Sequence, residues 1–243
     1  MKAQDWCGWG VSVIGPAHGR MGLPNQDAWM ARDLGEGAVL AVSDGMGSCS
    51  HAEIGSRAAC SAVLETIRHR FGCDAVSLDG LPGAIHLQWE ANLGDLDPAD
   101  CSATCLFAAT HPKAGTIFAQ LGDGFIAGLA ENGAVDLLAP DKSESFLNLT
   151  VGLASRDAID RWQTTLVDDR KYVALVACTD GIADDIEDPL IHQFVQAIYE
   201  HYCDYSQAER TRDVRRWLQH WPVPGHSDDK TIACIFRTGN ANA

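Results

Sequence analysis

Apolar runs separated by turn-forming residues divide the chain into strand-like and helix-like segments. Alternating or continuously apolar runs predict strands over residues 7–15, 27–33, 37–43, 102–110, 116–121, 125–130, 134–138, 163–167, 171–178 and 230–237. Apolar residues at helical spacing predict helices over 51–71, 81–93, 189–201 and 208–220. The predicted order is strands, two helices, many strands, two helices and one final strand.

Short connections between consecutive strands favour antiparallel pairing. We expect strand 27–33 to pair with 7–15, and we expect hairpins that join 102–110 to 116–121, 125–130 to 134–138, and 163–167 to 171–178. The Asn132-Gly133 dipeptide is a good turn signal for the second hairpin. Because the strands and helices do not alternate, a doubly wound fold is disfavoured. The pattern predicts an α+β fold in which two mainly antiparallel sheets are flanked by helical pairs, within a single domain over 1–243.

Composition narrows the class of protein. The chain has 33 acidic and 18 basic residues, a net charge of -15, which argues against nucleic acid and anionic membranes as partners. No apolar run reaches the length of a membrane span, and the first residues lack the pattern of a signal peptide. The nine cysteines are scattered without a Cys-x-x-Cys pair, which predicts free thiols and a cytoplasmic location.

Carboxylates recur where predicted strands end. Three strand-like runs finish in Asp-Gly, at Asp44, Asp123 and Asp180, and Asp27 and Asp228 lie at the starts of two further strands. Asp-Gly is also a common turn dipeptide, so any single copy can be an ordinary turn. Carboxylate oxygens that converge are the ligands preferred by hard divalent cations. The repeated pattern therefore favours a site for magnesium or manganese.

Other catalytic chemistries lack their motifs. The sequence has no His-x-x-x-His pair, no Gly-x-x-x-x-Gly-Lys loop and no Gly-x-Ser-x-Gly elbow. Cys49 lies near Asp44 in sequence, but Gly55 stands where a cysteine phosphatase loop needs arginine. Elimination therefore favours water activated by a metal ion held on carboxylates.

Six segments in order resemble the motifs of the metal-dependent protein phosphatases, the protein phosphatase 2C-like family, from about Gly15 to Phe236. These segments are Asn25-Gln26-Asp27-Ala28, Val42-Ser43-Asp44-Gly45-Met46-Gly47, Cys101-Ser102-Ala103-Thr104, Gly122-Asp123-Gly124, Thr179-Asp180-Gly181-Ile182-Ala183-Asp184 and Asp228-Asp229-Lys230-Thr231. The resemblance implies a four-layer α/β/β/α sandwich. It also implies a divergent bacterial branch of the family.

The resemblance implies a role for each acidic residue. Asp44 would bridge two Mn²⁺ or Mg²⁺ ions, with Asp27 and the Gly45 carbonyl on one ion and Asp180 and Asp228 on the other. Asp123 and Asp184 are similar to positions that bind a third, weaker metal. A water shared by the two ions would attack the phosphorus of a phosphoserine or phosphothreonine, without a protein nucleophile. The implied partners are a phosphorylated protein and a serine/threonine kinase that the enzyme opposes.

The chain departs from the family pattern at the position that usually binds the substrate phosphate and at two other motif positions. Gly22 stands where the family usually has a phosphate-binding arginine, and Arg20 or His18 could replace it. Gln26 and Asp229 replace a usual Glu and Asn. These departures leave two alternatives open: a catalytically weak module that binds a phosphoprotein or kinase, and a phosphatase for small molecules.

Overall fold

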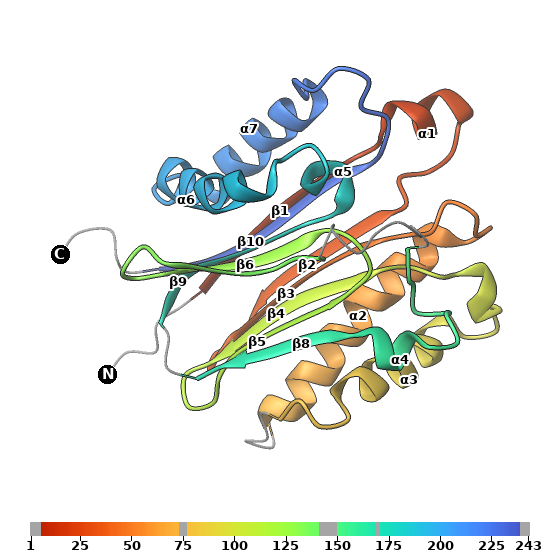
Figure 1. Cartoon of the computed structure of the whole chain (residues 1–243), viewed down its shortest axis with the longest axis horizontal. Helices are drawn as coiled ribbons and strands as arrows, with labels where there is room; N and C mark the ends of the chain where they lie inside the picture. The colour runs from red at the N-terminus through yellow and green to blue at the C-terminus, as the bar shows by residue number, and fades with distance from the viewer. Residues whose placement is uncertain (1–5, 73–76, 141–149, 169–170, 239–243) are drawn as a thin grey trace.

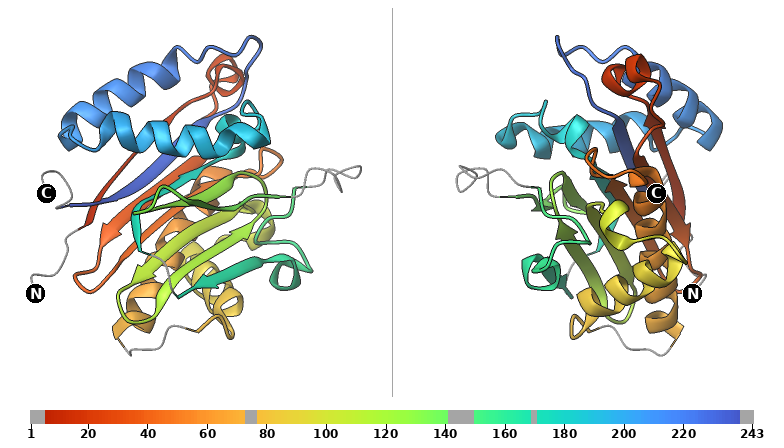
Figure 2. Two further views of the ribbon diagram at one scale, coloured as in Figure 1. Left: turned by 60° about the vertical axis from the view of Figure 1, so that its left-hand side comes forward. Right: turned by 90° about the vertical axis from the view of Figure 1, so that its right-hand side faces the viewer.

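Two five-stranded antiparallel sheets stack face to face, and helices cover the outer face of each (Figure 1). The computed structural model of the protein describes residues 6–72, 77–140, 150–168 and 171–238. The views in Figure 2 show the same four layers from two other directions. This architecture confirms the predicted α+β sandwich.

The first sheet has the strand order β1-β10-β9-β6-β7. Its strands are β1 (Trp6–Val13), β6 (Phe125–Ala130), β7 (Val135–Leu138), β9 (Tyr172–Cys178) and β10 (Lys230–Arg237). Helices α6 (Ile191–Tyr202) and α7 (Gln207–Gln219) pack on its outer face through Val195, Val214 and Leu218. A capping box between Ser206 and Glu209 satisfies backbone donors where α7 begins.

The second sheet has the strand order β2-β3-β4-β5-β8. Its strands are β2 (Asp27–Asp33), β3 (Ala38–Asp44), β4 (Cys105–His111), β5 (Gly115–Leu121) and β8 (Gln163–Val167). Helices α2 (Ala52–Gly72) and α3 (Leu81–Leu93) cover its outer face. Fully buried Ile67, Ile85 and Trp89 face Phe107 in this outer core.

A third core fills the space between the sheets. Leu40 and Phe118 from the second sheet pack with Leu175 and Ile235 from the first, and each is at most 3% exposed. Burying a side chain of this size stabilises a fold by about 1.5–3 kcal/mol relative to leaving it in water. The inner core therefore fixes how the ends of the two sheets meet, which is where the candidate site lies.

The predicted pairing of 7–15 with 27–33 is wrong. Strand β1 pairs along its whole length with β10, while β2 pairs with β3 in the other sheet. The two strands instead stack face to face, and a β-carbon at Gly10 would lie 2.6 Å from the Trp29 ring. Glycine at this position lets the bulky ring pack against the strand.

The predicted hairpin between 163–167 and 171–178 is also wrong. Strand β8 lies at the edge of the second sheet beside β5, whereas β9 is a central strand of the first sheet. The burial of the two strands agrees with these positions, because β9 is buried throughout and β8 is largely exposed. The other two predicted hairpins, β4 with β5 and β6 with β7, are confirmed.

Several short elements connect the layers and were not predicted. They are α1 (Pro16–Met21), η1 (Pro98–Asp100), α4 (Ala158–Arg161), α5 (Asp180–Ala183) and η3 (Asp188–Leu190). Two of them, α1 and α5, lie at the end of the sandwich that carries the strand-end carboxylates (Figure 1). Within the described ranges, none of the helices combines the length and apolar character needed to cross a membrane.

Candidate active site

The candidate site lies where strand ends of both sheets meet. Strand β2 begins at Asp27 and β3 ends at Asp44, and these two residues are direct partners across the antiparallel pair. Asp180 follows the end of β9, and Asp228 precedes the start of β10, in the facing sheet. The antiparallel order therefore brings to one edge of the sandwich four carboxylates that are distant in sequence.

Asp27 is the most buried carboxylate of the group, at 6% exposed. Its Oδ2 accepts a hydrogen bond of 2.8 Å from the Thr179 hydroxyl, whereas its Oδ1 is buried and has no partner among the described residues. Burial raises the pKa of Asp27 to about 6, against hydrogen bonds that lower it. A buried carboxylate oxygen without a donor is costly, so this atom points to a missing ligand.

Asp44 is held by the segment that ends in Thr104. The Asp44 amide donates to the Thr104 hydroxyl at 2.8 Å, and the Thr104 amide donates to the Asp44 carbonyl at 2.8 Å. Burial and the neighbouring charges of Asp27 and Asp180 raise the pKa of Asp44 well above its usual range. A β-carbon at Gly45 would collide with the Ala52 carbonyl, so only glycine lets β3 end so close to α2.

Asp180 and Asp228 share the wall of a pocket of about 220 Å³ with Asp184. Burial, followed by the charge of Asp228, raises the pKa of Asp180 to about 7. The Asp180 Oδ1 accepts from the Gly181 amide at 2.7 Å, and the Asp228 Oδ1 accepts from the Asp229 amide at 2.8 Å. These backbone bonds orient both carboxylates at the pocket.

Asp123 lies in a turn that adjoins the end of β9, outside the residues that line this pocket. It occupies the turn between β5 and β6, and its Oδ2 accepts from the Thr150 hydroxyl at 2.7 Å. Phe125 pairs with Cys178, and a β-carbon at Gly124 would lie 3.5 Å from the Thr179 Cα, so the backbone at Asp123 is near Asp180. The structure therefore brings Asp184 beside Asp180 and Asp228 in one pocket, and it places Asp123 in the turn that adjoins the end of β9.

Asp229 ties three segments together beside the site. This carboxylate is 1% exposed, and it accepts from the Gly15 amide at 2.6 Å, the Gln26 amide at 2.7 Å and the His18 ring at 2.9 Å. His18 is thereby placed next to the segment that leads to Asp27. Arg20, on the same short helix α1, is exposed.

The chemistry of these oxygen atoms fits a hard divalent cation. Within the described ranges, no three His, Cys, Asp or Glu side chains are gathered closely enough to hold a metal as they stand. The Oδ1 of Asp27 nevertheless has no partner in these ranges, and burial, together with neighbouring carboxylates, raises the pKa values of Asp27, Asp44 and Asp180. A divalent cation would satisfy both the orphaned oxygen and the charge.

The threonines that support these carboxylates were not assigned a role from sequence. Thr179 donates its hydroxyl to Asp27 and accepts from the Thr231 amide at 3.1 Å, which links the two sheets at the site. Thr104 acts differently, because its hydroxyl accepts from the backbone amide of Asp44 and so fixes the main chain that carries the carboxylate. All three threonines lie inside the six motif segments, so their position next to strand-end carboxylates was the available signal.

The raised pKa values predict an unusual pH dependence of stability without metal. Asp180 ionises near pH 4 when unfolded and near 7 when folded, so the folded state holds the extra proton between these values. With a chelator present, we therefore expect Asp180→Asn to stabilise the fold more at pH 7.5 than at pH 4.5. Urea unfolding of both proteins at each pH measures the difference, and an equal effect at both pH values would contradict the assignment.

A sequence model of the protein phosphatase 2C family matches residues 14–221 of the chain. The match includes Asp27, Asp44 and Asp180 and stops before Asp228. Among curated proteins, none matches the chain in sequence.

Solved structures of serine/threonine phosphatases share the fold. The catalytic domain of PstP, in complex with two manganese ions, is 17% identical with a TM-score of 0.63, over 96% of this chain and 98% of that one. The phosphatase of S. agalactiae is 16% identical with a TM-score of 0.62, over 96% and 99%. Stp1 of Staphylococcus aureus is 15% identical with a TM-score of 0.60, over 96% and 95%.

Proposed function

The chain belongs to the protein phosphatase 2C family, and we propose that it is a metal-dependent phosphatase that hydrolyses phosphoserine and phosphothreonine in proteins. The observation that carries this proposal is the pair of buried Asp27 and half-buried Asp44, which are direct partners across two strands, with one Asp27 oxygen unpartnered. A structural pair of carboxylates would be expected to have protein donors for every buried oxygen. A pair of carboxylates that binds a cation would instead keep an oxygen free of protein donors.

We assign the ligands as follows. Asp44 would bridge two ions, Asp27 and the Gly45 carbonyl would hold one, and Asp180 with Asp228 would hold the other. Manganese or magnesium bound there would activate water and neutralise the phosphoryl oxygens. Asp123 and Asp184 remain the residues proposed for a third ion, on the resemblance of their motifs to the family pattern.

The protein's own residues would orient this chemistry. The Thr179 hydroxyl fixes one Asp27 oxygen and thereby directs the other toward the site. Thr104 holds the backbone of Asp44 on both its amide and its carbonyl. No protein nucleophile is required, and Cys49 donates its thiol to the Ala99 carbonyl at 3.3 Å instead.

The substrate class rests on the similar structures, whose names describe serine/threonine phosphatases. We infer a phosphoprotein substrate and an opposing kinase by that analogy. Gly22 keeps a second candidate open, a module that binds phosphoproteins with little turnover, because the usual arginine is missing. Retention of Asp27, Asp44, Asp180 and Asp228 favours the enzyme.

A metal-dependent assay tests the proposed function. We expect the purified protein to hydrolyse a chromogenic phosphate ester, and phosphoserine or phosphothreonine peptides, in the presence of Mn²⁺. A chelator should stop this hydrolysis, and excess Mn²⁺ should restore it. Turnover that persists with the chelator would contradict the metal mechanism. Tight binding of phosphopeptide with less than one turnover would instead support the binding module, and a preference for small esters would favour a small-molecule phosphatase.

His18 is the better candidate for the phosphate-binding role. Its Nδ1 is engaged by Asp229, which fixes the ring and leaves Nε2 as the nitrogen that can meet a ligand. We expect His18→Ala to raise KM for a phosphopeptide roughly tenfold, the effect of losing one charged hydrogen bond of 1.5–3 kcal/mol at its lower end. Steady-state kinetics with Arg20→Ala as the matched variant checks this. A larger KM effect from Arg20→Ala would reverse the choice.

A further inference from the structure

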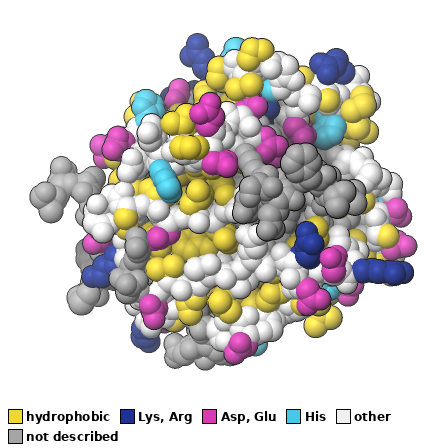
Figure 3. Space-filling view, viewed as in Figure 1, with side chains coloured by type: hydrophobic (Ala, Val, Ile, Leu, Met, Phe, Trp, Pro, Cys, Tyr) yellow, Lys and Arg dark blue, Asp and Glu magenta, His cyan; other side chains and the backbone are white. Residues whose placement is uncertain are grey.

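Helix α7 presents arginines to solvent on a protein that is strongly acidic overall. The helix contains Arg210, Arg212, Arg215 and Arg216 against only two carboxylates, while the whole chain has a net charge of -15. Cationic groups are sparse on the face shown in Figure 3 and stand among acidic ones. A local cationic surface is therefore a distinct feature of α7.

Arg210 has a structural role that the other arginines lack. It is 5% exposed, donates to the Tyr202 and Cys203 carbonyls at 2.8 Å each, and lies over the Phe236 ring. Arg215 and Arg216 are exposed, and neither forms an ion pair or side-chain hydrogen bond with another described residue. Their charges are therefore available to a partner.

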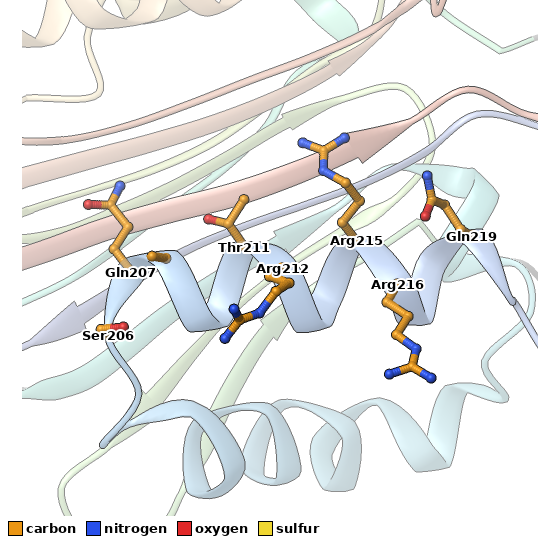
Figure 4. Close-up of a pocket in the computed structure, with 8 residues that line it drawn as sticks. Ser206, Gln207, Thr211, Arg212, Arg215, Arg216 and Gln219 are labelled. Carbon is orange, nitrogen blue, oxygen red and sulfur yellow. The ribbon is translucent and has the colours of Figure 1, made fainter.

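The exposed arginines line an open groove along the helix. One row of side chains consists of Gln207, Thr211, Arg215 and Gln219, and the next row contains Arg212 and Arg216 (Figure 4). All the lining residues belong to α7 or its N-cap, so the groove is a shallow, open face of one helix with a volume of about 1000 Å³ and no opposing wall within the described residues. The glutamine amides and hydroxyl groups on its surface can donate to and accept from a peptide backbone.

We propose that the α7 groove, defined by these lining residues, binds an acidic segment of a partner protein. Guanidinium groups pair well with carboxylates, and the three exposed arginines lie within little more than one helical turn, about 6 Å along the axis, which is close to the spacing of same-side residues in an extended peptide. A nucleic acid is disfavoured because three arginines neutralise few phosphates while the surrounding negative charge repels a long polyanion. This proposal is independent of catalysis and goes beyond the proposed phosphatase activity.

The groove is within reach of the candidate active site along the chain. Gln219 ends the helix, and the segment that follows leads directly to Asp228. Nine residues span at most about 30 Å when fully extended. A phosphoprotein bound at the site could therefore place an acidic segment on α7 at the same time, which would increase its effective affinity.

Peptide binding tests the groove directly. The probe is a fluorescent peptide of eight glutamate and aspartate residues, titrated by anisotropy at low salt, with a glutamine and asparagine peptide of equal length as reference. We expect Arg215→Glu with Arg216→Glu to weaken binding of the acidic peptide roughly tenfold, and we expect added salt to weaken wild-type binding. Backbone NMR shifts confined to α7 would locate the peptide.

A matched double variant separates local from general charge effects. Arg57→Glu with Arg68→Glu changes the net charge equally on the exposed face of α2. Equal loss of affinity for the acidic peptide in both double variants would overturn the proposal. Wild-type binding of the neutral peptide with equal affinity, or no binding of the acidic peptide up to millimolar concentration, would also overturn it. Tighter binding of a single-stranded oligonucleotide than of the peptide would do the same. Arg215→Gln with Arg216→Gln should fall between wild type and the charge reversal, and circular dichroism checks that each variant is folded.

Discussion

Replacing Asp44 with Asn is expected to reduce kcat for a phosphate ester about 100- to 1000-fold, the range for removal of one key electrostatic group. The physical reason is that Asp44 is assigned to both ions, so its loss weakens both at once. The same change should make the metal-free protein more stable, because Asp44 is an ionisable group that burial and the charges of Asp27 and Asp180 disfavour. Activity and stability are therefore expected to move in opposite directions.

The control for this prediction is Asp95→Asn, which removes an exposed carboxylate between α3 and η1. It should change neither kcat nor the urea midpoint appreciably. Kinetics at saturating Mn²⁺ and unfolding with a chelator provide the two measurements. If Asp44→Asn kept the wild-type kcat, the ligand assignment would be wrong. If the variant were less stable than the wild type without metal, the conclusion that the ionised Asp44 side chain destabilises the metal-free fold would be wrong.

Replacing Asp229 with Ala is expected to cost about 3–5 kcal/mol of the free energy of unfolding. The substitution leaves the buried amides of Gly15 and Gln26 without an acceptor, and each such loss costs about 1–3 kcal/mol. It also releases His18. Because small proteins are stable by only about 5–15 kcal/mol, this single carboxylate accounts for a large part of the stability.

Asp229→Asn is the matched variant. It keeps one acceptor oxygen of nearly the same shape but turns an amide donor toward the remaining N–H groups, so we expect a smaller loss than with Ala. Denaturant unfolding of both variants gives the two values. A cost below 1 kcal/mol for Asp229→Ala would mean that water satisfies these amides and that the carboxylate does not organise the segment.

Much of the fold could be predicted because most elements have a strong local pattern. The apolar periodicity of 81–93 and 230–237 gave the bounds of α3 and β10 that the structure has. Strand pairing was harder to predict, because it depends on which sheet each strand joins when the two sheets stack. Strands β8 and β9 are neighbours in sequence, yet the short connection between them crosses from one sheet to the other, and no local signal marks such a crossing.

The candidate site was only partly accessible to sequence reasoning. Strand-end carboxylates such as Asp27 and Asp44 follow from the pattern and are direct partners in the structure. The role of Asp229 could not be read in the same way, because its hydrogen-bond partners Gly15 and His18 are more than 200 positions away. Long-range contacts of buried polar groups are set by the packed sheets and not by neighbouring residues.

The central place of β10 has a consequence for the newly synthesised chain. This strand is the last element, yet it lies between β1 and β9, and the residues just before it supply Asp228 and Asp229. A ribosome-bound chain from which these residues have not yet emerged lacks the strand between β1 and β9 and lacks Asp228 and Asp229, although Asp27, Asp44 and Asp180 have already been made. The first sheet and the candidate site are therefore expected to form only after β10 and the segment before it have been synthesised.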